Sequence, residues 1–335
     1  MAFSEEILLG IYHDLKVKSV LLFMLFSLIA GFLLSNQSPI NADLSRIVRS
    51  PFIAGTISFI IGTLFLGVLA LTMSGRLFPS GSFIRTQPMW IWLGGLLGAV
   101  YLTSNILLFP KIGAIQTTIL PIMGQITMGT ITDSFGWFGA EKIAMTPWRL
   151  VGIGVLIVGV VVAVVLPSLT NRDVRQFDTT VTRQRKSTAM IGWQIWGVVI
   201  GVLAAMQQAI NGHLGTLLHS TSQAAFISFF VGTILIAIVA GVIDKRVPTT
   251  RELKTTRPWN WLGGLLGGSF LFVTVVAVPQ IGAGLTIMMG LIGQIIGSVL
   301  IQQFGWWRSA HQPMVPAQAL GIGLMIVGVG LIKMA

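Results

Sequence analysis

Long apolar runs alternate with short polar stretches along almost the whole chain. Ten of these runs are long enough to cross a bilayer as one helix, because a crossing needs about 17–25 residues. They cover residues 19–36, 52–71, 90–109, 113–132, 148–166, 191–210, 225–243, 259–278, 282–301 and 317–333. The pattern predicts an all-α membrane protein with ten transmembrane helices, whose first partner is the lipid bilayer.

The longest polar stretch lies between the fifth and sixth runs and divides the chain into two halves. Residues 168–189 have the polar composition of a surface linker. We therefore predict one five-helix unit over residues 1–167 and a second over residues 190–335.

The two halves repeat each other. "WLGGLLGAVYLTSNILLFPKIGA" begins at Trp92, "WLGGLLGGSFLFVTVVAVPQIGA" begins at Trp261, and the two share 12 identities without a gap. "ISFIIGT" from Ile57 likewise matches "ISFFVGT" from Ile227. Matched residues are 170 positions apart early in the unit and 169 apart later, so one residue was gained or lost between the copies. The chain is a duplication of one five-helix unit.

The odd number of crossings in each unit decides how the two copies lie. A second copy that starts on the opposite side of the membrane is inverted relative to the first. Inverted repeats recur in secondary transporters, which bind substrate near the bilayer midplane where the halves meet. We therefore expect a transporter of a small polar metabolite or drug. The same repeat would also serve an ion or water channel, or a membrane protein with only a structural role.

Composition and charge agree with a membrane protein. Hydrophobic residues make up 54% of the chain and charged residues 9%, whereas about 25% of a soluble domain is charged. The net charge of +11 comes from Lys and Arg between the apolar runs, so we expect no nucleic-acid partner. Seven basic residues lie on the side that holds both predicted termini and fourteen on the other side. The positive-inside rule then favours termini outside the cytoplasm.

Amide side chains recur at matched positions in the two halves. Unpaired polar groups are costly in hydrocarbon, so these side chains should face the bundle interior. The candidate solute-binding residues are Gln125, Gln294, Gln37, Asn41, Gln207, Asn211, Asn105 and Gln116, with Tyr101 and Gln208 as neighbours. Gln125 and Gln294, central in the fourth and ninth helices, are the preferred pair. An amide both donates and accepts hydrogen bonds, which suits an uncharged or zwitterionic solute. The same amides could instead join helix to helix.

Charged side chains are absent from the middle of every predicted span. Asp133, at the exit of the fourth helix, is the only candidate for proton coupling, although a solvated charge at a helix end would also explain it. The four histidines lack metal-ligand spacing, the chain has no cysteine, and no catalytic constellation occurs. We expect no metal, no cofactor and no enzyme activity.

The repeat and three motifs resemble the drug/metabolite transporter superfamily, most closely its YdcZ-type branch. The motifs are "LPIMGQ" (Leu120–Gln125), "QSPINADL" (Gln37–Leu44) and "MQQAINGHL" (Met206–Leu214). The resemblance implies small-molecule transport at a bacterial inner membrane by alternating access. It also implies cytoplasmic termini, against the charge count, which leaves the orientation open. The chain is similar to two single five-helix members fused, and either a monomer or a homodimer is compatible with that.

Overall fold

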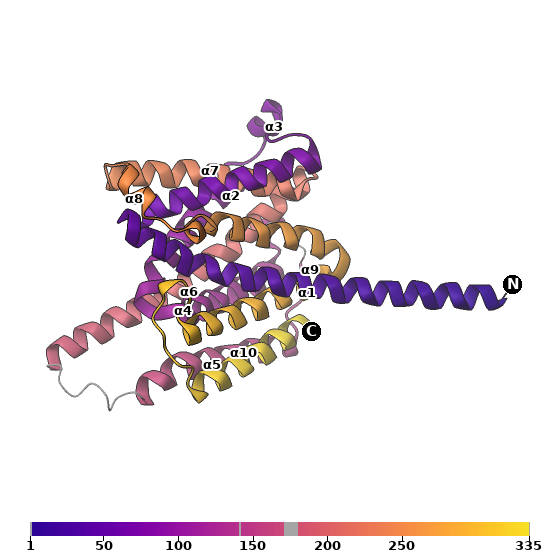
Figure 1. Cartoon of the computed structure of the whole chain (residues 1–335). Coiled ribbons are helices and arrows are strands. Elements are labelled where there is room, and N and C mark those ends of the chain that lie inside the picture. Colours follow the sequence, from indigo (N-terminus) through magenta and orange to yellow (C-terminus); the bar gives the residue numbers. More distant parts are fainter. Residues whose placement is uncertain (1, 141, 171–179, 335) are drawn as a thin grey trace.

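The computed structural model describes residues 2–140, 142–170 and 180–334, and every regular element in these ranges is a helix (Figure 1). The long helices are α1 (Ala2–Val48), α2 (Pro51–Ser74), α4 (Gly94–Phe135), α5 (Pro147–Thr170), α6 (Thr180–Leu217), α7 (Thr221–Ile243), α9 (Gly263–Phe304) and α10 (Pro316–Met334). The short ones are α3 (Gly81–Thr86), η1 (Met89–Trp92), η2 (Trp137–Gly139), α8 (Thr250–Lys254), η4 (Pro258–Trp261) and η5 (Trp306–Arg308). The expected all-α fold is confirmed for the described residues.

Seven stretches of the described residues are long and apolar enough to cross a membrane. They are Lys18–Val48, Pro51–Ser74, Met89–Phe135, Pro147–Val164, Ala189–Leu217, Thr221–Ile243 and Thr286–Phe304. Gly263–Thr274 and Pro316–Ile332 are shorter apolar helices. Because one crossing takes about 20 residues, the 47 residues of Met89–Phe135 are far more than a single crossing needs.

Helices α4 and α9 each fold back on themselves. A straight helix of 42 residues would be about 63 Å long, yet the ring centroids of Trp90 and Phe138, on either side of α4, are 6.0 Å apart. Trp259 and Trp307 flank α9 in the same way, 6.1 Å apart. In α4 the chain reverses at Gly113, where φ is 78° and ψ is 175°. Only glycine adopts that conformation readily.

Two helix ends differ from those predicted. The first apolar run was expected to end at residue 36, but α1 continues to Val48, so Gln37 and Asn41 lie well inside the helix. The hydropathy pattern fails here because these polar side chains find partners on other helices. Helix α6 begins at Thr180, inside the predicted linker, and residues 171–179 of that linker lie outside the described ranges.

Each long helix packs mainly against a helix from the other half. Helix α1 lies against α9 and α4 against α6, while α2 pairs with α7 and α5 with α10 (Figure 1). Where α2 crosses α7, matched residues meet: the Thr63 and Thr233 hydroxyls are 2.8 Å apart. The rings of Phe59 and Phe229 are 5.0 Å apart. When the two halves are exchanged, each of these helix pairs maps onto one of the same pairs. A two-fold axis between the halves would have this effect.

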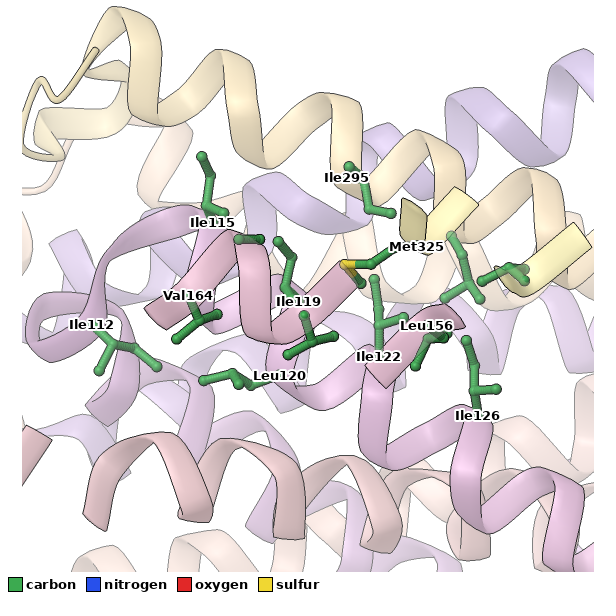
Figure 2. Packing of buried hydrophobic residues seen from close by; sticks show 14 of the residues in the cluster. Ile112, Ile115, Ile119, Leu120, Ile122, Ile126, Leu156, Val164, Ile295 and Met325 are labelled. Atoms are coloured by element: carbon green, nitrogen blue, oxygen red, sulfur yellow. The ribbon is translucent and has the colours of Figure 1, made fainter. Parts of the chain in front are cut away.

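An apolar core joins α4, α5, α9 and α10. Buried Ile119 and Ile122 of α4, Leu156 of α5, Ile295 of α9 and Met325 of α10 belong to it. Figure 2 shows these side chains converging from the four helices. Lipid tails are as apolar as these residues, so close packing, and not the exclusion of water, holds the helices together here.

The carboxylate of Glu252 holds together the polar segment between α7 and α9. The Arg246 guanidinium donates to both oxygens of Glu252, at 3.0 Å each, and Glu252 and Thr249 form a reciprocal cap at the start of α8. The hydrogen bond from the backbone N–H of Thr249 is the main cause that lowers the pKa of Glu252. The hydrogen bond from the Arg246 side chain lowers it further. A carboxyl with a lowered pKa stabilises the fold above its unfolded pKa, and this contribution is lost as the pH falls through its folded pKa.

We therefore expect α8 to loosen on acidification. Amide exchange of residues 250–254, compared at each pH with Glu252→Gln, should be slower in the unchanged protein at pH 7. The two should converge as the pH falls below the ordinary carboxyl range. A difference that persists at low pH would show that the charge of Glu252 does not hold this cap.

Candidate functional site

Four of the predicted amides sit in grooves made by glycines of the other half. Gln37 Nε2 donates to the Gly263 carbonyl at 3.0 Å, and a Cβ on Gly267 would lie 2.5 Å from the same nitrogen. In the other half, Gln207 Nε2 lies equally close to the Cβ position of Gly98. The helices approach so closely because glycines spaced four apart present only backbone.

Asn41 and Asn211 repeat this arrangement one turn further along. Asn41 Nδ2 donates to the Ser58 hydroxyl at 3.2 Å, and Asn211 Nδ2 donates to the Ser228 hydroxyl at 3.1 Å. Their hydrogen bonds run between neighbouring helices, from α1 to α2 and from α6 to α7. This geometry favours the interpretation of these four amides as contacts between helices.

A second group of polar side chains gathers where α4 packs against α6. Gln208 Nε2 donates to Gln125 Oε1 at 3.3 Å. The Tyr101 hydroxyl lies near the side chains of Asn105 and Gln125, and Asn105 Nδ2 donates to the Tyr101 carbonyl at 2.9 Å. We call these four residues the amide cluster. It brings together two predicted site residues, Asn105 and Gln125, with their two neighbours.

Gln208 is exposed although it lies in the middle of a membrane helix. The lipid-facing side of α6 is marked by Ile191 and Ile195, which are 53% and 59% exposed. At about 100° per residue, Gln208 points roughly 140° away from Ile195. Gln208 therefore lies on the side of α6 that faces α4 and away from the side marked by Ile191 and Ile195.

A further amide pair lies on the same face of α6. Gln194 Nε2 donates to Gln116 Oε1 at 3.0 Å. Gln194, Gly201 and Gln208 are seven residues apart, so they share one side of the helix. Between the two amide contacts, a Cβ on Gly201 would lie 2.1 Å from the Pro121 carbonyl oxygen. Polar contacts thus flank a tight crossing of α6 and α4.

Gln125 and Gln294, the preferred pair of candidate residues, have different surroundings in the described part of the chain. Gln294 is 7% exposed on α9, next to Ile295 of the apolar core. At the positions that match the amide cluster, Phe270, Thr274 and Gln294 lie on α9 of the second half, and Ser38 lies on α1 of the first half. The cluster therefore exists once, in the first-half helix α4 and its partner α6. Contact of Gln294 with a solute stays a prediction.

Asp133 is paired rather than free. Its Oδ2 lies 3.3 Å from Nη2 of Arg149, whose side chain is buried at the start of α5. A charge neutralised at a helix end explains Asp133 without any role in transport, and its role in proton coupling stays a prediction. The predicted spans missed a different carboxylate, that of Asp43, which is 1% exposed inside α1. The early end assigned to the first helix had placed Asp43 in a loop.

No three histidine or acidic side chains lie together as a metal site within the part of the chain that the structure describes. The amide cluster contains hydroxyl and carboxamide groups only. Such groups can orient a solute through hydrogen bonds, but they supply neither a nucleophile activated by a base nor a fixed charge.

Comparisons with known proteins bear on the fold and on the family. Eleven solved protein chains share the fold. One crystal structure, whose title names no function, has a TM-score of 0.55 and 13% identity, covering 93% of this chain and 97% of its own. No curated protein matches the sequence.

A family model described as "Putative inner membrane exporter, YdcZ" matches twice, over residues 22–162 and 192–331. The two matches correspond to the two halves of the duplication and cover most of the chain. The chain therefore belongs to the YdcZ family of the drug/metabolite transporter superfamily and is a multi-pass transporter of the inner membrane.

Proposed function

We propose that this protein exports a small, uncharged polar solute by alternating access, using ten crossings arranged as two inverted five-helix repeats. The solute binds at the amide cluster of Tyr101, Asn105, Gln125 and Gln208. The observation that carries the site is the exposure of Gln208 on the side of α6 that faces the protein.

The ten crossings are supported by the two folded helices. The flanking contacts Trp90–Phe138 and Trp259–Trp307 occur at matched positions, so each of α4 and α9 enters and leaves on the same side of the bundle. Counting each as two crossings, and α1, α2, α5, α6, α7 and α10 as one each, makes ten.

The inverted relation is supported by the direction of the paired helices. A Cβ on Gly62 would touch Phe229, and one on Gly55 would touch Ile236, so residues advance along α2 while their partners retreat along α7. Helices that are copies of each other and pack antiparallel are related by an axis in the membrane plane. Transporters built in this way bind substrate where the two halves meet.

The chemistry of the cluster sets the class of solute. Carboxamides and a phenol both donate and accept, so they recognise hydroxyl, amide or carbonyl groups. The four side chains carry no charge to balance an ionic solute. The solute leaves the site chemically unchanged, because the cluster provides no catalytic group.

Proteoliposomes loaded with a pool of neutral metabolites test this proposal. We expect uptake of one labelled member of the pool to saturate and to be driven by the unlabelled compound inside, with the compound recovered intact. Flux that rises linearly with concentration and shows no counterflow would indicate a channel. The absence of any specific flux would contradict transport of a neutral solute.

A further inference from the structure

The buried carboxylate of Asp43 lies at the end of the bundle where α1 stops, which we call the Val48 end. Asn260 Nδ2, from η4, donates to Asp43 Oδ2 at 3.0 Å. Nη1 of Arg308, from η5, lies 3.8 Å from Asp43 Oδ1, and Nη2 of Arg46 lies 3.9 Å from it. Asp43 is 1% exposed, whereas the two arginine side chains are about half exposed. A charge buried this deeply needs these partners.

These contacts join the two halves of the protein. Asp43 and Arg46 belong to the first half, and Asn260 and Arg308 belong to the second. Arg46 Nη2 also donates to the Arg308 carbonyl at 3.2 Å. The ionic contacts therefore connect two units that must move relative to each other in alternating access.

A buried apolar layer lies beside the ionic contacts. Ala42, Phe109, Ala114 and Ile301 are buried together, and Trp307 packs against them. Trp307 Nε1 donates to Asn36 Oδ1 at 2.6 Å, which again joins the second half to the first. Opening the Val48 end to water would have to separate this layer.

The opposite end of the bundle does not repeat these charges at the matched positions. The positions that match Asp43, Asn260 and Arg308 hold His213, Ile91 and Gly139. There the His213 ring stacks on Trp90, with 5.3 Å between ring centroids. The repeat duplicated the helices, but it kept this set of charges at one end only.

We propose that Asp43, with Asn260, Arg308 and Arg46, forms a latch that holds the Val48 end closed. The latch rests on the proposed alternating-access function. It biases the empty protein toward the state in which this end is sealed, because opening would break the contacts of Asp43 with Asn260 and Arg308 of the other half. A contact made in only one of two states shifts the population toward that state.

The absence of native cysteine makes the latch directly testable. Ala114, which is 5% exposed, can be changed to Cys as a reporter in the apolar layer. The purified full-length protein in nanodiscs, without solute, is treated with a polar maleimide, and the labelling rate is measured. Labelling requires no transport, so its outcome does not depend on the solute or on the amide cluster.

In this reporter, Asp43→Asn should raise the labelling rate about tenfold, since an uncharged amide cannot form the ionic contact with Arg308 that joins the halves in the closed state. Arg308→Gln, at a half-exposed position that should not disturb folding, should raise it by a smaller factor. The matched change His213→Gln, at the opposite end, should not raise it. Unchanged labelling in both Asp43→Asn and Arg308→Gln, or equal acceleration by His213→Gln, would overturn the latch.

Discussion

Gly124→Ala should destabilise the protein more than a single methyl group usually does. A Cβ on Gly124 would lie 2.1 Å from the Val198 carbonyl oxygen and 2.8 Å from the Val202 backbone nitrogen, both on α6. Backbone atoms cannot rotate away as a side chain can, so α4 and α6 would have to separate. Overpacking of this kind costs about 1–3 kcal/mol and sometimes more. The measurement is the thermal midpoint of the detergent-solubilised protein.

Gly129→Ala on the same helix is the matched control. A Cβ on Gly129 meets no atom within 4 Å, and the corresponding position in the second half already holds Ser298. We expect the thermal midpoint of this variant to be unchanged or slightly raised, because alanine favours helix over glycine. If both variants lower the thermal midpoint equally, the close approach of α4 and α6 at Gly124 does not cause the loss of stability.

Gln125→Leu should reduce the transport efficiency, kcat/KM, by about tenfold. The substitution keeps the approximate volume but removes the donor and the acceptor that are shared with Gln208 and Tyr101. One lost hydrogen bond to a bound solute, with its partner left unpaired, costs about 1–3 kcal/mol. Initial rates of solute uptake into proteoliposomes, at a measured amount of folded protein, give this quantity.

Two controls separate solute binding from the joining of helices. Gln37→Leu removes the hydrogen bond to the Gly263 carbonyl, so it should lower the thermal midpoint while kcat/KM per folded molecule stays the same. Gln208→Leu should resemble Gln125→Leu, and the double variant should lose less than the product of the single effects, since both act on one site. If the double variant transports the solute as well as the unchanged protein, the amide cluster only joins α4 to α6 and does not bind the solute.

Gln294→Leu tests the prediction that Gln294, like Gln125, contacts the solute. A loss comparable to that of Gln125→Leu would show that the solute also contacts α9. If the solute contacts the amide cluster alone, Gln294→Leu should affect stability and leave kcat/KM unchanged. The two results distinguish a solute that contacts α4, α6 and α9 from one that contacts α4 and α6 alone.

Part of the candidate site can be predicted from the amino-acid sequence alone. Asn105, Gln116 and Gln125 stand out as amides in apolar runs, and the structure places all three along the contact between α4 and α6. The spacing of Gln194, Gly201 and Gln208 was also readable as one face of a helix. Nothing in a single sequence shows which helix that face meets, so Gln208 could be noted only as a neighbour and Gln194 was missed.

The sequence by itself determined that the chain lies in a membrane, that it is a duplicated unit, and which family it belongs to. These properties depend on local composition and on the match between the two halves, for example Trp92 with Trp261, and neither requires a folded chain. The tertiary structure alone decided which amides touch glycine, which remain exposed, and that Asp43 is buried. A polar side chain in a membrane takes its role from its partner, and the partner of Gln37 is Gly263, 226 residues away along the chain.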